Sequence, residues 1–364
     1  MDQKKLVVLS GIVIGAIAVI LTKLGNPANM GMCVACFIRD IAGGLGLHRA
    51  EVVQYIRPEV PGFILGSFLI SLAFGEFNAR GGSATLTRFI IGFFVMVGAM
   101  VFLGCPLRMV LRLSAGDLNA LFAFFGFASG IYYGLIFIKK GFSLGRSYKL
   151  SKGNGYIMPL VAVVLLILVL VAPSFIFFSA KGPGSMRAPF IISLAAGLIV
   201  GALAQRSRLC MAGGIRDIFL LKDFHLFSGF AGIFTAALIL NIVFGNFKLG
   251  FEKQPIAHTM ELWNFLGMFL AGFGSILLGG CPLRQCILAG EGDTDAGAAF
   301  FGMLVGAAFS HNFGISASVQ GVGTNGKIAV VLGIIFLTAI ALLNMPAMVN
   351  VKKEGESAWQ PKSI

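Results

Sequence analysis

A five-residue segment, Gly-Cys-Pro-Leu-Arg, occurs twice in this chain, at 104–108 and at 280–284, and each copy closes a long apolar run. Two further pairs of blocks keep the same spacing of 176 residues: Gly-Asp at 116–117 and 292–293, and Phe-Phe-Gly at 124–126 and 300–302. Upstream, residues 33–40 parallel residues 210–217 at a spacing of 177. Four matched blocks in the same order indicate an internal duplication.

The composition places this chain in a lipid bilayer. Of its 364 residues, 57% are hydrophobic and only 12% are charged, and the mean hydropathy is +0.91. Soluble domains carry about 25% charged residues. The net charge of +13 fits the excess of Lys and Arg in the cytoplasmic loops of membrane proteins. No basic run with interleaved aromatic residues is present, so we expect no nucleic-acid partner.

Apolar stretches of about 17–23 residues predict helices that span the bilayer. The sequence contains ten, at 6–24, 60–76, 88–104, 118–138, 156–178, 189–205, 226–245, 262–279, 295–311 and 327–346. Four more apolar segments are too short or too broken by Gly and Pro to span, at 30–46, 105–115, 207–221 and 281–291. The predicted fold class is an all-α integral membrane protein, with about 8–10 transmembrane helices and four short re-entrant half-helices in two inverted repeats. Broken segments at matching places in two halves point to a transporter binding site.

The distribution of charge predicts the orientation. The strongest positive cluster, between Lys139 and Lys152, is placed in the cytoplasm, and counting spans from it puts both termini there. Each half then holds five spans, and an odd number inverts the second half relative to the first. We expect a first membrane repeat at 1–180, a second, inverted repeat at 181–348 and a cytoplasmic tail at 349–364.

The repeated pentapeptide has the features of a helix start. Proline suits the first position of a helix, so Cys105 and Cys281 are expected at the N-cap, with the preceding glycine letting the chain turn. The positive end of a helix attracts anions and favours a thiolate. Arg108 and Arg284 add a fixed charge at membrane depth, where an arginine is costly and marks function. These residues predict a site for a small anion, lined by soft sulfur that suits a substrate exposing sulfur or selenium.

The upstream blocks repeat this logic. Their arginine and aspartate neighbours are interpreted as ion pairs that brace the half-helices inside the membrane; the alternative is solvated charges at the water boundary. A free cysteine also packs like a small apolar residue, but a cysteine in both halves favours a functional role. The predicted substrate pathway comprises Cys33, Cys105, Cys210, Cys281, Arg108, Arg284, Arg39 (with Asp40) and Arg216 (with Asp217).

Other motifs receive structural interpretations. Cys36 and Cys286 have no counterpart in the other half and are expected to serve packing, although a redox pair or an outward-facing disulfide of Cys33 with Cys36 stays open. Asp117 and Asp293 are expected to cap the helices that follow them. Gly-x-x-x-Gly pairs predict close helix packing in lipid; they lie at 11/15, 62/66, 126/130, 197/201 and 302/306. We expect no catalytic residue, no cofactor and no metal site.

At these motifs the chain resembles the YeeE/YedE family of bacterial membrane proteins. The segment from Gln205 to Asp217 is close to that family's hallmark, Gly-Gly-Cys-Pro-Leu-Arg resembles its second motif, and the similarity covers about 25–345. The resemblance implies a multi-pass protein of the bacterial plasma (inner) membrane. Its understood members take up thiosulfate through an hourglass-shaped protein, in which cysteines at the constrictions pass the ion along by thiol hydrogen bonds. By position, the resemblance assigns that role to Cys105, Cys210 and Cys281, with Cys33 as the symmetric fourth.

One branch of the family is associated with selenium metabolism, and the segment from Met30 to Asp40 looks most like that branch. Cys36, in place of a glycine, departs from the thiosulfate pattern. The prediction is therefore a transporter, not an enzyme, for a small selenium- or sulfur-containing species, with a selenium compound favoured and thiosulfate next. The resemblance also implies a small cytosolic sulfur-carrier protein as a partner.

Two alternatives stay open at the level of sequence. A membrane thiol oxidoreductase or sulfurtransferase would use Cys33 with Cys36, or Cys281 with Cys286. An accessory subunit is the third interpretation, and duplicated arginines at membrane depth argue against it.

Overall fold

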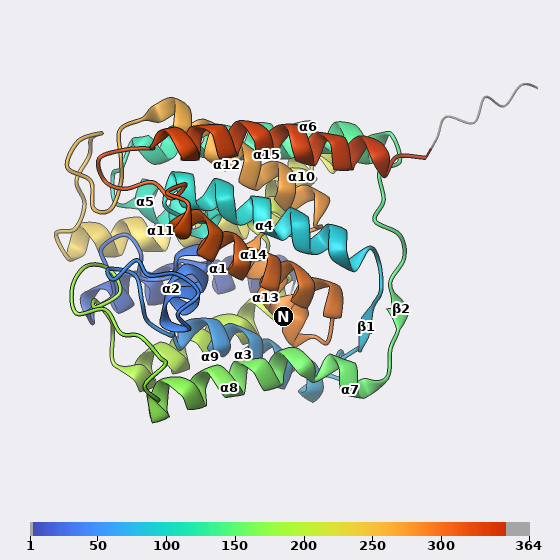
Figure 1. The fold of residues 1–364 in the computed structure, drawn as a ribbon, viewed down its shortest axis with the longest axis horizontal. Helices are drawn as coiled ribbons and strands as arrows, with labels where there is room; N and C mark the ends of the chain where they lie inside the picture. The colour runs from blue at the N-terminus through green and yellow to red at the C-terminus, as the bar shows by residue number, and fades with distance from the viewer. Residues whose placement is uncertain (1–2, 347–364) are drawn as a thin grey trace, which may run out of the picture.

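The computed structural model describes residues 3–346, which form a bundle of helices whose axes are roughly aligned (Figure 1). The first half contains α1 (Gln3–Lys23), α2 (Val34–Gly44), α3 (Glu59–Ala73), α4 (Thr85–Phe102), α5 (Pro106–Ser114), α6 (Asn119–Lys139), α7 (Lys152–Gly155) and α8 (Ile157–Val171). The second half contains α9 (Phe190–Ser207), α10 (Met211–Leu221), α11 (His225–Val243), α12 (Glu261–Leu277), α13 (Pro282–Gly290), α14 (Thr294–Asn312) and α15 (Thr324–Leu343). Two short strands, β1 (Arg80–Gly81) and β2 (Tyr148–Lys149), pair antiparallel. The predicted tail at 349–364 lies outside the described residues.

Every predicted span and every predicted half-helix is a helix in the structure. Within residues 3–346, seven helices are long and apolar enough to cross a membrane, when α5, α10 and α13 are each counted with the helix before them. The predicted spans outside that count are α3 and α8, which have 15 residues each, and the more polar α14. The predicted span at 156–178 is too long, because Ala172 takes the left-handed conformation (φ 47°) and ends α8 ahead of Pro173. The all-α, multi-pass membrane fold is confirmed.

Seven helices of the first half have counterparts in the same order in the second half; α7 and the two strands have none among the described elements. The correspondence runs α1 to α9, α2 to α10, α3 to α11, α4 to α12, α5 to α13, α6 to α14 and α8 to α15. The most extensive helix pairings join different halves: α6 with α12, α4 with α14, α1 with α11 and α3 with α9. The two halves are therefore interlocked rather than side by side.

The direction of the paired helices is that of an inverted duplication. In α14, Gly302 and then Gly306 lie against Phe89 and then Phe93 of α4, so these two helices run parallel. The counterpart of α4 is α12, and these two helices run antiparallel, since Gly98 faces Gly267 of α12 whereas the later Gly274 faces the earlier Val95 and Ile91. Corresponding helices thus run in opposite directions. The boundary between the repeats at residue 180 stays a prediction.

Glycines make these pairings close. At each of the five Gly-x-x-x-Gly pairs, a Cβ on either glycine would meet backbone atoms of the facing helix. In α6, for example, a Cβ on Gly126 or Gly130 would collide with the carbonyl oxygen of Phe265 or Phe269 of α12. The packing interpretation of these motifs is confirmed, and it is the one expected where small residues let backbones approach in lipid.

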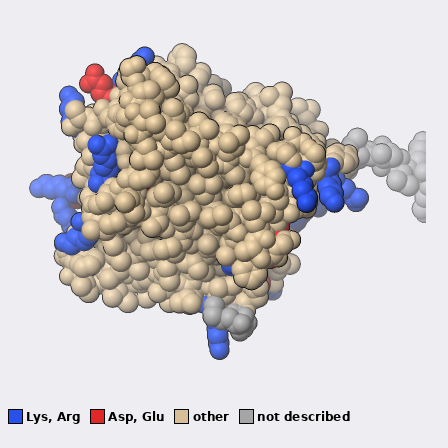
Figure 2. Space-filling model, turned by 90° about the horizontal axis from the view of Figure 1, so that it is seen from below, with Lys and Arg blue, Asp and Glu red and all other residues tan. Residues whose placement is uncertain are grey.

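The loops gather at two ends of the bundle (Figure 1). At one end, which we call the β-ribbon end, Arg80 of β1 pairs with Lys149 of β2, and Arg206 and Arg208 bind Glu76 nearby. At the opposite end the guanidinium of Arg57 donates to the carbonyl of Met186 at 2.9 Å. In Figure 2, Lys and Arg side chains gather toward these ends, and the surface between them is largely uncharged, as a lipid-facing surface must be.

Replacement of Gly130 by alanine is expected to weaken the contact between α6 and α12. The added Cβ collides with the Phe269 carbonyl, and overpacking of this kind costs about 1–3 kcal/mol. The measurement is the melting temperature of the detergent-purified protein, which should fall by several degrees. Gly153→Ala is the matched control, because a Cβ at Gly153 has no neighbour within 4 Å; equal melting temperatures for the two variants would contradict the close packing.

Candidate functional site

The four cysteines predicted to form the pathway lie together as two pairs. The Sγ atoms of Cys33 and Cys105 are 3.7 Å apart, and those of Cys210 and Cys281 are 3.9 Å apart. All four side chains are buried; Cys210 is the most accessible at 6%. Each pair joins two half-helices of one half of the chain, so the duplication has produced two similar thiol sites.

Each thiol pair sits where two helices begin. Cys33 and Cys105 are the N-caps of α2 and α5, and Cys210 and Cys281 are the N-caps of α10 and α13. The Sγ of Cys33 accepts a hydrogen bond from the Cys36 amide at 3.3 Å, and the Sγ of Cys210 accepts one from the Gly213 amide at 3.3 Å. Two helix N-termini thus converge on each pair. Their partial positive charges add, which makes each pair attractive to an anion.

The chain turns one residue earlier than expected. The left-handed residues are Leu103 (φ 63°) and Gly279 (φ 80°), so the prediction that Gly104 and Gly280 make the turn is wrong. The motif glycines instead leave room for the arginine four residues later. A Cβ on Gly104 would lie 2.8 Å from Cδ of Arg108, and the equivalent distance from Gly280 to Cγ of Arg284 is also 2.8 Å.

Side chains from α5 satisfy the carbonyls that are freed where α4 ends. Arg108 donates to the carbonyl of Leu103, and Arg112 donates to that of Phe102 at 3.0 Å. A ring nitrogen of His258 lies 2.8 Å from the carbonyl of Val101. These carbonyls have no partner within the helix, and in a bilayer each must find one inside the protein. The motif arginine is therefore part of what allows a helix to break at this depth.

The two motif arginines differ in their surroundings. Arg108 is fully buried, and among the described residues no carboxylate lies within ion-pair distance of it. Arg284, with a side chain 12% exposed, forms an ion pair with Glu291 at 3.2 Å. The charge of Arg284 is thus balanced within the protein, whereas the charge of Arg108 is not.

The upstream ion pairs differ in the same way. Arg39 and Asp40 are buried and joined at 2.7 Å, and Arg57 binds the other oxygen of Asp40 at 2.8 Å. Arg216 and Asp217 are also joined at 2.7 Å, but the Arg216 side chain is 36% exposed. Arg39 and Asp40 therefore form an ion pair inside the protein, as predicted. Arg216 fits the alternative interpretation, in which the charge is exposed to solvent.

A cluster of ion pairs at the β-ribbon end was not expected from the sequence. Glu291 binds Arg208 at 3.1 Å, Arg284 at 3.2 Å and Arg80 at 3.9 Å, and Arg208 also binds Glu76 at 2.8 Å. Arg208 lies two residues before Cys210, so this cluster sits beside the second thiol pair. One signal was available: Glu291 is an acidic residue at the end of an apolar segment, directly before the repeated Gly-Asp pair.

The remaining motif residues have mostly structural contacts. Asp293 is the N-cap of α14 and accepts from the Ala296 amide at 3.0 Å, as predicted. Asp117 lies one residue ahead of the N-cap of α6; it accepts from the Asn119 amide at 3.0 Å and also binds Arg112.

All six cysteines are free thiols in the structure, so Cys33 and Cys36 form no disulfide.

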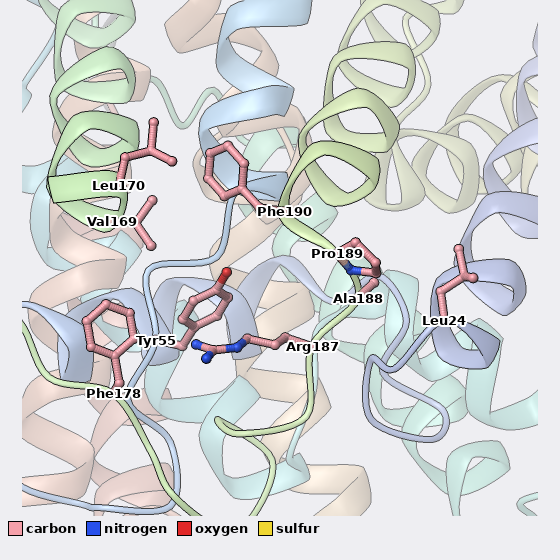
Figure 3. A pocket seen from close by; sticks show the side chains of 9 residues that line it. All are labelled: Leu24, Tyr55, Val169, Leu170, Phe178, Arg187, Ala188, Pro189 and Phe190. Atoms are coloured by element: carbon pink, nitrogen blue, oxygen red, sulfur yellow. The ribbon is translucent and has the colours of Figure 1, made fainter. Parts of the chain in front are cut away.

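A cavity of about 500 Å³ lies apart from the thiols, at the opposite end (Figure 3). The guanidinium of Arg187 lies over the ring of Tyr55 there, 4.6 Å from its centre, and Leu170 and Phe190 form apolar walls. No cysteine lines this cavity. The candidate pathway therefore remains with the two thiol pairs.

The pairing of the thiols predicts the products of mild oxidation. In the variant Cys36→Ala/Cys286→Val, which retains only the four paired cysteines, diamide is expected to link Cys33 to Cys105 and Cys210 to Cys281. Mass spectrometry of the digested protein identifies the linked peptides. A link between the two pairs, such as Cys33 to Cys281, would show that the thiols are arranged differently.

Glu291→Gln is expected to destabilise the β-ribbon end. The change leaves the largely buried Arg284 without its counter-charge, and loss of one partner of a buried ion pair is costly. Because the other arginines of the cluster are partly exposed, we expect the free energy of unfolding to fall by about 1–3 kcal/mol. The measurement is the melting temperature, which should be lower in the variant. Glu252→Gln, at an exposed position, is the control. Equal stability of both variants would mean that Glu291 is not needed by its arginines.

A family model and two known proteins match parts of this chain. Residues 206–363 match the family described as "Sulphur transport". The chain is 32% identical to the thiosulfate transporter TsuA of Spirochaeta thermophila over 112 residues, which are 30% of this chain and 33% of that relative. It is 26% identical to the thiosulfate transporter TsuA of Escherichia coli over 173 residues, which are 46% of this chain and 49% of that relative. The matched segments thus span only a third to a half of the length of these relatives. The match over residues 206–363 lies in the second half of the chain and agrees with the resemblance to the YeeE/YedE family.

Proposed function

We propose that this protein is a membrane transporter that carries a small sulfur- or selenium-containing anion past two thiol pairs. The observation that carries this proposal is the convergence of two helix N-termini on each pair, Cys33 with Cys105 and Cys210 with Cys281. The similarity to two thiosulfate transporters supports transport over catalysis. It also makes thiosulfate the first substrate to test, with a selenium compound as the second.

The chemistry of the thiol pairs supports a soft anion. A thiol is a weak hydrogen-bond donor and its sulfur is polarizable, so it suits a terminal sulfur or selenium atom better than a strongly hydrated oxygen. The helix N-termini supply partial positive charge without a bound cation. A small anion with one soft end would meet both needs at each pair, because its charge faces the amides and its soft atom faces the thiols.

The position of the pairs supports passage across the membrane. Cys105 lies beside the loops of the opposite end, since Arg108 of the same half-helix donates to the carbonyls of Asn29 and Ile256 there. Cys210 lies beside the ion-pair cluster of the β-ribbon end. The two pairs would therefore receive and release the anion at different faces. Arg39 and Arg216, which belong to the half-helices of Cys33 and Cys210, would hold these helices in place.

We place the β-ribbon end on the cytoplasmic side of a bacterial inner membrane. This end carries the positive cluster between Lys139 and Lys152, and such clusters are retained on the cytoplasmic side. A small cytosolic sulfur-carrier protein would then meet the anion at this end. The same orientation makes Cys33 and Cys105 the first thiols that an incoming anion reaches.

The test is uptake of radiolabelled thiosulfate, selenite and sulfate by proteoliposomes that contain the purified protein. Uptake of thiosulfate or selenite, with little uptake of sulfate, is expected. In Cys105→Ala and Cys281→Ala the initial rate should fall at least tenfold, because each change removes one thiol of a pair and leaves the other without its partner.

Cys286→Val is the matched control, since Cys286 is buried but belongs to neither pair and its counterpart in the first half is Val110. Its uptake should equal that of the wild type. Equal flux of every anion in the wild type and in Cys281→Ala would exclude the thiol pathway. It would favour a membrane thiol oxidoreductase or sulfurtransferase instead.

A further inference from the structure

The two thiol pairs are not equivalent, because a third cysteine lies beside only one of them. Cys36 follows Cys33 by one helical turn and is fully buried. The corresponding residue beside Cys210 is Gly213, which offers no side chain. The duplication therefore built two similar pairs, and Cys36 makes one of them different.

Cys36 contacts the groups that define its pair. Its amide donates to the Sγ of Cys33 at 3.3 Å, and its own thiol lies 3.6 Å from Nη1 of Arg108. The thiol also donates to the carbonyl of Leu103 at 3.8 Å, two residues before Cys105. A role in packing accounts for the burial of Cys36, but it does not account for this set of polar contacts.

Arg108 gives this cluster an unbalanced charge. Its N–H groups donate to the carbonyls of Asn29, Ile256 and Leu103 and to the Cys36 sulfur, which leaves one of its five N–H groups free. A buried charge that is not paired is costly. In the part of the chain that the structure describes, the other motif arginine, Arg284, and the buried Arg112 have carboxylates, and Arg108 has none. An anion bound at this cluster would supply the missing charge.

We infer that Cys36, together with Arg108, determines which anion this protein selects. The three thiols of Cys33, Cys36 and Cys105 hold the soft sulfur or selenium atom of the anion, and Arg108 balances its charge. The pair of Cys210 and Cys281 has neither the third thiol nor an unbalanced arginine, so it passes the anion on without selecting it. This inference rests on the proposed function and adds the residue that sets its specificity.

The chemistry explains the direction of the preference. An anion whose outer atoms are all oxygen, such as sulfate, loses strong hydration on entering a buried site and gains only weak thiol donors in return. An anion with a terminal sulfur or selenium is less strongly hydrated at that atom and loses less. Each further thiol therefore favours the soft anion over the hard one, and a single hydrogen bond of this kind corresponds to a change of up to about tenfold in affinity.

The test compares Cys36→Ala and Cys36→Ser with the wild type in proteoliposomes. For thiosulfate, which carries a terminal sulfur, KM is expected to rise about tenfold in both variants, while the maximal rate changes little. Unlabelled sulfate should compete better in both variants than in the wild type. Cys286→Val, the control with a buried cysteine that has no hydrogen bond to these three thiols, should keep the KM and the sulfate competition of the wild type.

The variant Cys36→Ser distinguishes a role of Cys36 in anion selection from a purely structural role. The serine hydroxyl can still donate to the Leu103 carbonyl and hold the turn, but it lacks the soft sulfur. Wild-type KM and sulfate competition in Cys36→Ser would show that Cys36 only supports the backbone, and this result would overturn the inference. An unchanged KM in Cys36→Ala would overturn it as well. Absence of uptake of every sulfur and selenium anion by the wild type would instead remove the proposed function itself.

Discussion

Backbone contact at glycines holds the two halves of this chain together, and the positions of the thiols depend on it. Helices in a bilayer gain little free energy from burying apolar side chains against one another, so close packing must stabilise their association. The five Gly-x-x-x-Gly pairs bring backbone against backbone, and the facing helix belongs to the other half of the chain. The half-helices that carry the cysteines are short, between 9 and 11 residues, and are marginal on their own. They keep their places because the long helices around them form one interlocked frame.

A broken helix inside a membrane creates a second need, and the repeated pentapeptide meets it. Where α4 ends, carbonyls lose their partners, and arginines of the following half-helix donate to them. The proline starts the new helix, the cysteine occupies its N-cap, and the glycine leaves space for the arginine to fold back. One short segment therefore ends a helix, begins another and leaves a thiol at the joint. The same features that satisfy the backbone also create the positive environment that an anion needs.

Much of this arrangement is predictable from sequence because it depends on local patterns and on duplication. Apolar length gives the spans, and the Cys-Pro order gives the N-caps. Backbone conformation and ion pairing at the helix breaks depend on the packing around them, and there the predictions are incomplete or wrong. Nothing in the pentapeptide shows that the turn falls on Leu103 and Gly279, or that Glu291 balances Arg284 while Arg108 has no carboxylate. The length of α8 also depended on the backbone conformation of a single residue, Ala172.

Duplication explains the similarity of the two thiol pairs, and divergence explains how their surroundings differ. Two identical thiol sites would bind a given anion equally well, and both sites would have the same preference among anions. The structure departs from that symmetry in both charge and thiol number. The cluster at Cys33 keeps an unbalanced buried arginine and a third cysteine, while the pair at Cys210 adjoins arginines already bound to Glu291 and Glu76. Strong, selective binding and easy release are opposing demands on a single site, and in the proposed transporter two related but unequal sites would allow one chain to meet both.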